Sequence, residues 1–177
     1  MYPTLKVNDQ IAVEKFSKFV SAPRRGDLIV FVPPKRFYEV KGLTKAPRST
    51  LIKRVVAVAG DKVEVRDGTL LLNDRALYEP YANREPANYK VSPMIVPPGH
   101  VFVLGDNRNL SDDSHVWGPL PVGNIIGKAF YVLWPQERWG FVDEVMQDMA
   151  ITGNPAAFNE RLQDYAKSSK SRPPPVQ

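Results

Sequence analysis

The chain contains no cysteine among its 177 residues. A disulfide scaffold, a zinc site built on thiolates and a cysteine nucleophile are therefore excluded. No stretch reaches the roughly 20 apolar residues that a membrane-spanning helix needs, and no secretory signal peptide is visible. Dense runs of Lys and Arg are missing outside residues 35–36 and 167–172. With a net charge of +5 and a pI of about 9.4, we expect a generally basic surface and no nucleic-acid partner.

Proline is abundant instead, with 17 residues. Prolines disfavour long helices and suit short strands joined by ordered turns. Apolar runs rich in β-branched residues predict strands at residues 11–14, 28–32, 51–59, 63–66, 69–72, 101–104 and 125–134. Asp67 and Gly68 form a typical hairpin turn between two of these runs. We expect an exposed loop over residues 33–50 and an irregular segment over residues 78–98.

Only the end of the chain has a helical pattern. Apolar spacing at i, i+3, i+4 and i+7 predicts a helix over residues 142–149, and Asn154-Pro155 resembles the start of a second one, over residues 154–165. Residues 167–177 are rich in Ser, Lys and Pro and are expected to be disordered. The predicted fold is mostly β, with many short strands forming a β-core, a small β extension and one or two C-terminal helices.

Lys53 lies inside an apolar run. Strand alternation places Leu51, Lys53, Val55 and Ala57 on one face, so that face carries a lysine among apolar side chains. Burial would lower the pKa of this amine, and a neutral amine can take a proton from a hydroxyl group. The alternative is an edge-strand lysine whose ammonium reaches solvent and stays charged. Taken alone, the segment favours the alternative.

Residues 105–118 follow a predicted buried strand and are dense in short polar side chains. Such side chains hydrogen-bond to the backbone and fix irregular loops. Asp106, Asp112 and Asp113 are also oxygen ligands of the kind calcium prefers. However, the alternating acids, central glycine and final glutamate of an EF-hand are absent. We therefore expect neither a metal ion nor another cofactor.

Four segments, in order, resemble the sequence boxes of type I signal peptidases, which are serine–lysine proteases. MYPTL at residues 1–5 resembles their Ser-Met-x-Pro-Thr-Leu box without its serine, and RGDLIVF at residues 25–31 resembles their Arg-Gly-Asp strand box. IKRVVAVAGD at residues 52–61 resembles the lysine box. GDNRNLSDDSHVWG at residues 105–118 resembles the Gly-Asp-Asn-Arg…Ser-x-Asp-Ser…Trp-Gly box.

This resemblance implies a membrane-associated endopeptidase that removes signal peptides from exported preproteins after small-x-small residues. Residues 1–134 would form the catalytic domain, with residues 63–98 as a smaller β or irregular insertion. Residues 135–177 match no box and would form a helical extension and a tail. A transmembrane helix preceding Met1 would anchor the enzyme in a plasma or thylakoid membrane, with the catalytic domain on the periplasmic or lumenal side.

The resemblance also implies roles for individual residues. Lys53 would be the general base, and Ser111 would hydrogen-bond its amine and orient it. Three charged residues would brace the site by ion pairing: Arg54, Asp106 and Asp113. Gly105 would brace it by letting the backbone approach the lysine closely.

Substrate selection would follow from shallow apolar pockets, because larger side chains would clash there. The first pocket would be lined by Met1, Leu5, Leu51 and Ile52, and the third by Ile11 and Ile52. The end of the signal peptide would lie as an extended strand beside residues 50–53.

Two departures from the family pattern affect these expectations. The nucleophilic serine would stand directly before Met1, and no other hydroxyl occupies its place in the pattern. We therefore expect a protein made of residues 1–177 alone, called the printed chain below, to be inactive as a protease. In addition, His115 stands where family members often have arginine, so the pair with Asp113 becomes an Asp–His pair that can respond to pH.

Two alternatives remain open at the level of sequence. One is a self-cleaving serine–lysine protease of the repressor type, although the first and last boxes fit that class less well. The other is a non-catalytic binding module with a basic surface, in which Lys53 would be exposed and charged.

Overall fold

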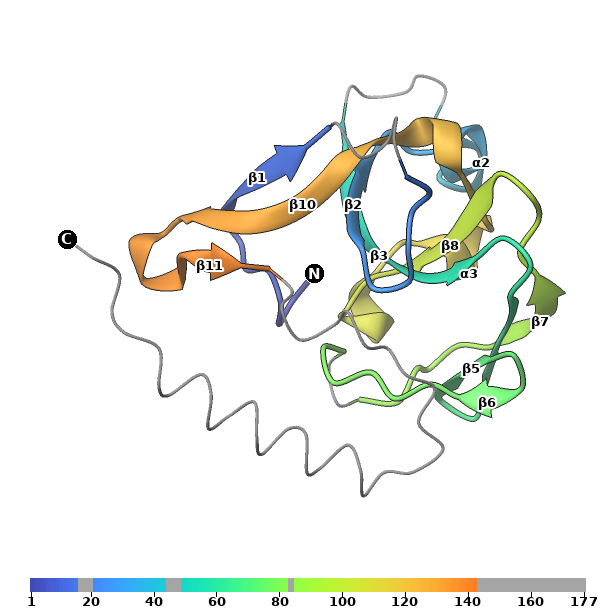
Figure 1. Cartoon of the computed structure of the whole chain (residues 1–177). Coiled ribbons are helices and arrows are strands. Elements are labelled where there is room, and N and C mark those ends of the chain that lie inside the picture. The colour runs from blue at the N-terminus through green and yellow to red at the C-terminus, as the bar shows by residue number, and fades with distance from the viewer. Residues whose placement is uncertain (16–20, 44–48, 83–84, 143–177) are drawn as a thin grey trace.

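The computed structural model describes residues 1–15, 21–43, 49–82 and 85–142 (Figure 1). The predicted C-terminal helices and disordered tail therefore lie outside the described residues, apart from the first residue of the first helix.

Seven strands form an antiparallel sheet in the order β1-β10-β2-β3-β8-β9, with β11 paired to β10. These strands are β1 (Gln10–Glu14), β2 (Leu28–Phe31), β3 (Leu51–Val58), β8 (His100–Leu104), β9 (Leu120–Pro121), β10 (Ile125–Trp134) and β11 (Gly140–Phe141). The long strand β10 pairs with β2 through its first half and with β1 and β11 further along. It thereby extends an arm, formed with β1 and β11, away from the rest of the sheet (Figure 1).

A second antiparallel sheet, in the order β6-β5-β4-β7, comes between β3 and β8 in the chain. Its strands are β4 (Lys62–Arg66), β5 (Thr69–Leu72), β6 (Arg75–Ala76) and β7 (Val91–Ile95). The hairpin predicted at Asp67-Gly68 joins β4 to β5, and both turn residues have the positive φ angles that this two-residue turn requires. The mostly-β fold class predicted from the sequence is confirmed.

Short helical turns interrupt the strands: α2 (Lys35–Val40), η1 (Arg108–Leu110), α3 (Ser114–Trp117), η2 (Val122–Asn124) and η3 (Gln136–Arg138). The prediction of a loop throughout residues 33–50 is wrong at α2, where the buried side chain of Tyr38 supplies a tertiary anchor that local periodicity does not show. The segment expected to be irregular at residues 78–98 likewise contains β7, because it finds a partner in β4.

The predicted alternation along β3 is wrong beyond Val55. The pairing of β3 with β8 shifts register between Val55 and Ala57, as at a β-bulge. Val56 and Ala57 consequently pack in one apolar cluster, with the second sheet, whereas Val55 packs in another cluster, with Trp117. This irregularity places two consecutive side chains of β3 in the same apolar cluster.

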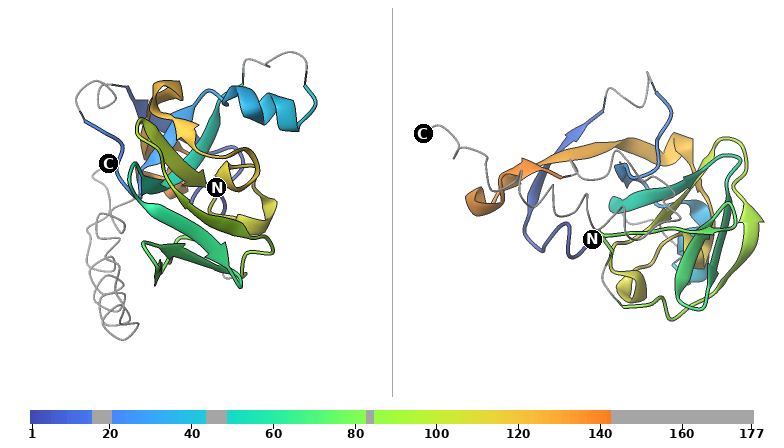
Figure 2. Two further views of the ribbon diagram at one scale, coloured as in Figure 1. Left: turned by 90° about the vertical axis from the view of Figure 1, so that its right-hand side faces the viewer. Right: turned by 60° about the horizontal axis from the view of Figure 1, so that its bottom comes forward.

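The two ends of β3 have different neighbours, and this difference creates an open edge. β2 pairs with residues 51–54 of β3, whereas β8 pairs only from Arg54 onward. Residues 51–53 therefore have no β8 partner on their second edge. The N terminus of the chain lies between the arm and the remaining strands in both Figure 1 and the right-hand view of Figure 2.

Candidate active site

Lys53 lies partly buried on the open part of β3. Burial lowers the pKa of its amine below the ordinary lysine value of 10.5, and this effect outweighs the opposing charges of Asp113, Asp112 and Asp106. The direction of the shift favours a neutral amine, which is the form a general base requires.

The first residue of the chain lies within electrostatic reach of this lysine. Burial lowers the pKa of the Met1 α-amino group, and the positive charge of Lys53 lowers it further, while Asp106 raises it. The backbone N–H of Leu5 donates to the carbonyl oxygen of Met1 at 2.9 Å and folds the first residues into a turn. Hence the start of the printed sequence and the lysine share one environment.

Arg54 and Asp106 form a fully buried ion pair beside the lysine. Nε and Nη2 of Arg54 donate to the two carboxylate oxygens of Asp106 at 2.9 and 2.8 Å, and neither side chain has exposed area. Nη1 donates to the carbonyl oxygen of Gly26 at 3.0 Å, and the guanidinium lies 4.0 Å from the ring centre of Tyr81. The Thr4 hydroxyl donates to Asp106 and accepts from Arg54. The charges are thus compensated where water does not reach.

Asp113 organises the loop that follows β8. One carboxylate oxygen accepts from the backbone N–H of Gly105 at 2.9 Å. The other accepts from the backbone N–H of His115 at 3.2 Å and lies 2.7 Å from its Nδ1 atom. The imidazole of His115 stacks on Tyr89, with ring centres 3.8 Å apart. The Asp113–His115 pair expected from the sequence is therefore present, and it joins both ends of the loop.

Ser111 packs directly against Gly105. A Cβ atom added to this glycine would lie 2.2 Å from the Ser111 hydroxyl oxygen and 2.7 Å from its Cβ, so no larger residue fits without movement. The three atoms nearest to such a Cβ belong to Ser111 and Asp113, and the close approach of the Gly105 backbone to Lys53 stays a prediction. The Ser111 oxygen is buried and has no hydrogen-bond partner within the described part of the chain. Its bond to Lys53 stays a prediction.

Four of the five residues predicted to line the substrate pockets lie in one apolar cluster. Leu5 is buried there, and Met1, Ile11 and Ile52 pack against it. Leu51 packs instead against the cluster that contains Phe31 and Trp117, because it lies on the opposite face of β3 from Ile52.

Several residues around this site were not identified from the sequence. Thr4 contacts Asp106, and the hydroxyl oxygen of Ser114 accepts from a backbone N–H of β8 at 3.0 Å. Glu79 and Tyr81 come from the segment predicted to be irregular, and nothing in a single sequence marks them as neighbours of the site. Arg108 stands inside the GDNR motif, so the motif itself was a signal for it.

A profile of the family described as "Signal peptidase, peptidase S26" matches residues 1–134. The chain belongs to this family. Thylakoidal processing peptidase 1, a chloroplastic protein of Arabidopsis thaliana, is 45% identical over 159 residues, which cover 90% of this chain and 46% of that protein. The chain thus spans about half the length of that relative.

Bacterial relatives in the signal peptidase family are also similar. A probable signal peptidase I-1 of Synechocystis is 46% identical over 140 residues, covering 79% of this chain and 69% of that protein. The crystal structure of a signal peptidase I from Enterococcus faecalis is 29% identical, covers 62% of this chain and 97% of that chain, and has a TM-score of 0.49.

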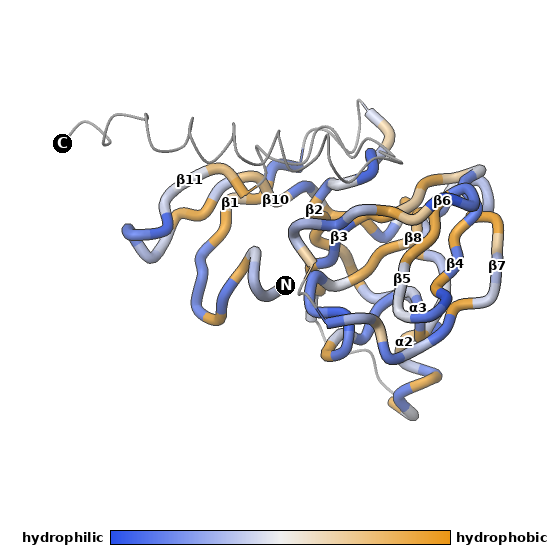
Figure 3. The backbone as a smooth tube through the Cα atoms, turned by 90° about the horizontal axis from the view of Figure 1, so that it is seen from below, coloured by the Kyte–Doolittle hydropathy of each residue, from blue (hydrophilic) through white to orange (hydrophobic). Residues whose placement is uncertain are grey.

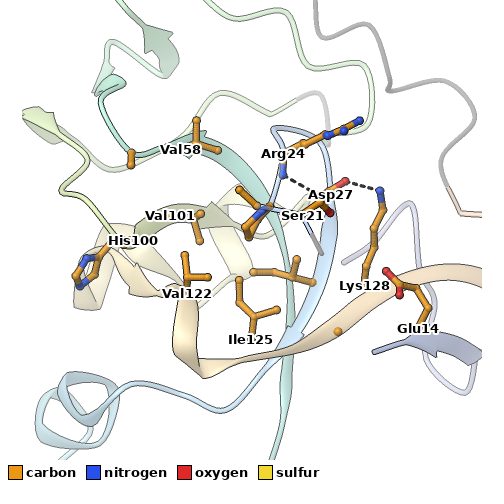
Figure 4. A pocket seen from close by; sticks show the side chains of 16 residues that line it. Glu14, Ser21, Arg24, Asp27, Val58, His100, Val101, Val122, Ile125 and Lys128 are labelled. Carbon is orange, nitrogen blue, oxygen red and sulfur yellow. Dashed lines mark hydrogen bonds and ion pairs between the residues drawn. The ribbon is translucent and has the colours of Figure 1, made fainter. Parts of the chain in front are cut away.

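A separate pocket of about 850 Å³ lies elsewhere in this member of the signal peptidase family (Figure 4). Its wall contains the ion pair between Asp27 and Lys128, at 2.5 Å, and apolar side chains such as Val101 and Ile125. None of the predicted site residues lines it. We therefore place the candidate active site at Lys53, where an amine with a lowered pKa adjoins the open edge of β3.

Neither a metal centre nor a membrane span is found in the described residues. They contain no group of three or more His, Cys, Asp or Glu side chains arranged to hold a metal ion. No helix within the same residues is long and apolar enough to cross a bilayer.

Proposed function

We propose that this chain is the catalytic part of a signal peptidase that cleaves signal peptides from exported preproteins. The nucleophile would be a serine covalently preceding Met1, and Lys53 would be its general base. The observation that carries this proposal is the partly buried Lys53, with its lowered pKa, next to both the first residue and an open strand edge. The non-catalytic alternative required this lysine to be exposed and charged.

The proposed reaction proceeds in two steps. Neutral Lys53 takes the proton of the serine hydroxyl while the serine oxygen bonds to the scissile carbonyl carbon. The C–N bond then breaks, and the lysine proton passes to the leaving amine, which yields an acyl-enzyme. Water attacks this ester with the same lysine as base, and the bond between the acyl carbon and the serine oxygen breaks. The lysine proton passes to the serine oxygen, which regenerates the enzyme and releases the signal peptide with a new carboxyl group. The backbone N–H of the serine would stabilise the oxyanion.

Ser111 and the charged residues have supporting roles in this proposal. The Ser111 hydroxyl is buried next to Gly105 and would hydrogen-bond the lysine amine once the nucleophile is present. Arg54 and Asp106 pair beside the lysine, and Asp113 accepts from the backbone N–H of Gly105, the residue against which Ser111 packs. Bracing here means fixing the distance between the base and the serine oxygen, on which proton transfer depends.

Substrate binding would use the open edge of β3. A signal peptide in extended conformation would pair through its backbone with residues 51–53, as an added strand. Its small side chains would enter the apolar cluster formed by Met1, Leu5, Ile11 and Ile52. We propose that Leu51 contributes to the rim of the first pocket from the other face of the strand.

Membrane association is proposed from exposed apolar side chains at the end of the arm, where Figure 3 shows hydrophobic stretches along β10 and β11. The exposed residues, defined here as the arm patch, are Phe130, Leu133, Trp134, Trp139 and Phe141. Aromatic side chains of this kind favour the membrane–water interface, and the positive net charge favours anionic lipid. We propose a thylakoid or plasma membrane as the location, with this domain on the lumenal or periplasmic side. One similar protein, from Arabidopsis thaliana, is named as thylakoidal.

The membrane proposal is tested with anionic phospholipid vesicles. We expect Phe141→Ser to weaken sedimentation of the chain with vesicles, whereas Ile95→Ser, which removes a similarly exposed residue from β7 (59% against 61%), should not. Equal binding by both variants would contradict a role for the arm patch.

The catalytic proposal is tested by adding one serine directly before Met1, behind a cleavable leader. The substrate is a fluorogenic peptide with alanine at the first and third positions before the cut. We expect turnover by the serine-extended chain and none by the printed chain or an alanine-extended one. Lys53→Met should reduce kcat by a factor on the order of 10³, because the base is lost. Lys35→Met, at a fully exposed lysine, is the matched control.

A serine-extended chain that folds but cleaves nothing would refute the proposed function. Turnover by the printed chain that depends on Lys53 would refute the assigned nucleophile.

A further inference from the structure

We propose that Glu79 and Tyr81 are positioning residues for peptide cleavage, because they hold the Gly105–Asp106 backbone in place through two arginines. The inference rests on the proposed function and adds residues that lie outside the sequence boxes. Both residues lie in the connection between β6 and β7, so a loop of the second sheet supplies them to a site built on the first.

Glu79 is the centre of this contact network, which comprises Glu79, Tyr81, Arg108 and Arg54. Its two carboxylate oxygens accept from Nη1 and Nη2 of Arg108 at 2.5 and 2.6 Å, a bidentate geometry. One of the same oxygens accepts from the Tyr81 hydroxyl at 2.5 Å. The side chains of Arg108 and Glu79 are only 6% and 8% exposed, so the pair is largely shielded from water.

Arg108 connects Glu79 to the loop that follows β8. Burial alone would lower the pKa of Arg108, but the charge and hydrogen bonds of Glu79 outweigh burial and raise it, so the guanidinium stays charged. Its Nε donates to the carbonyl oxygen of Gly105 at 3.1 Å. Glu79 therefore fixes the residue against which Ser111 packs.

Tyr81 carries the effect of Glu79 along a second route. Burial, together with the charge of Glu79, raises the pKa of Tyr81, so its hydroxyl remains a donor. Its ring lies under the guanidinium of Arg54, 4.0 Å away, in cation–π contact. Arg54 in turn holds both oxygens of Asp106. Gly105 and Asp106 are adjacent, so the two routes hold one peptide unit.

Movement of this peptide unit would change the environment of Lys53. Burial lowers the pKa of the lysine amine, and the charges of Asp113, Asp112 and Asp106 raise it. The Met1 α-amino group lies within electrostatic reach of Lys53. Glu79 is not one of the charges that shift its pKa, so loss of Glu79 acts through position. A released Asp106 and easier access for water would both favour the charged amine, and the pKa of Lys53 would rise.

The test uses the serine-extended chain for activity and the printed chain for NMR. In the extended chain, we expect kcat at neutral pH to fall on the order of tenfold for Glu79→Gln and about threefold for Tyr81→Phe, with KM little changed. The acid limb of the pH–kcat profile should move to higher pH in both. Glu79→Asp, which keeps the charge, should restore part of the loss. In the printed chain, both loss variants should raise the pKa of Lys53, followed through its side-chain NMR signals.

Matched controls come from the same part of the chain. Glu64→Gln alters an ion-paired glutamate on β4, and Tyr78→Phe alters an exposed tyrosine; both should retain the parental kcat and profile. Tyr81→Phe removes one oxygen and no charge, so it decides the matter even if Glu79→Gln fails to fold.

An unchanged pH profile and an unchanged Lys53 pKa in folded Tyr81→Phe and Glu79→Gln would overturn the inference. A serine-extended parent without activity would refute the proposed function alone, since the NMR measurement on the printed chain does not depend on turnover.

Discussion

Replacing Asp106 by asparagine should destabilise the protein far more than the same change at an exposed ion pair. The side chains of Arg54 and Asp106 are both fully buried. Asparagine keeps the shape and one acceptor oxygen, but it leaves the guanidinium without its counter-charge. Removing one partner of a buried pair typically costs about 3–5 kcal/mol, because the remaining charge is uncompensated.

The other contacts of Arg54 set the expected value within this range. The Gly26 carbonyl oxygen at 3.0 Å, the Thr4 hydroxyl at 3.3 Å and the Tyr81 ring at 4.0 Å all persist and offer partial negative charge. We therefore expect a loss near the lower end, about 3 kcal/mol. For a protein of this size, that loss corresponds to a fall in Tm of about 6–12 °C.

The assay is urea unfolding of the printed chain, followed by tryptophan fluorescence, and requires no catalytic activity. Asp74→Asn is the matched control, since Asp74 pairs with Lys62 at 2.6 Å but is 67% exposed; its loss should stay below about 1 kcal/mol. The double variant Arg54→Gln with Asp106→Asn removes both charges and keeps amide hydrogen bonding. It should be no less stable than the worse single variant, because no lone charge remains buried.

Two results would refute this reasoning. One is a loss for Asp106→Asn that matches the loss for Asp74→Asn within about 0.5 kcal/mol. The other is a double variant whose loss equals the sum of the two single losses, since additivity would mean that the charges do not interact.

Four further predictions concern the site itself. Asp112→Asn removes a charge that raises the pKa of Lys53, so NMR titration should show that pKa falling further, and the acid limb of kcat/KM in the serine-extended chain should move to lower pH. The pKa of Lys53 is lower in the folded chain than the ordinary value of 10.5, which holds for the unfolded chain. Between the folded and the unfolded pKa the unfolded chain binds more protons, so denaturant titrations should show stability rising with pH over that range. Gly105→Ala should cost about 1–3 kcal/mol in urea unfolding through its clash with Ser111, and adding Ser111→Gly should recover part of this loss. Ile52→Ala should enlarge the substrate pocket and improve the kcat/KM of the extended chain for valine relative to alanine before the cut by about tenfold, measured with paired peptides.

Local patterns in the sequence were enough to predict most of the strands. Runs such as residues 28–32 and 125–134 combine β-branched residues with flanking turn residues, and β2 and β10 form there. The turn at Asp67-Gly68 was also predictable, because its residue types suit positive φ angles. These features depend on neighbours in the chain, which a single sequence displays directly.

Features that depend on distant partners could not be predicted in the same way. The bulge in β3 arises from its pairing with β8, about 45 residues later in the chain. β7 forms because β4 offers an edge to it, although the run of residues 91–95 includes a proline. The contacts of Glu79 with Arg108 join positions 29 residues apart and have no periodic signature.

The candidate site was predictable only through the resemblance of four boxes. On the lysine segment alone, an exposed, charged Lys53 was the favoured interpretation. Whether the lysine is buried depends on the loop after β8 and on the first residues of the chain, which local alternation does not describe. The ion pair of Arg54 with Asp106 likewise joins two boxes that are 52 positions apart.

The partners of the three acids around Lys53 explain why the pKa of this lysine can be low despite their negative charges. Asp106 is paired with Arg54, Asp112 with Lys41 at 2.5 Å, and Asp113 with His115. Each acid directs its charge toward a partner other than the lysine, so burial remains the largest influence on the amine. Loss of these partners would raise the pKa of Lys53, because the charges of the acids would be less compensated. The partners of these acids therefore favour a neutral Lys53 as well as a fixed loop after β8.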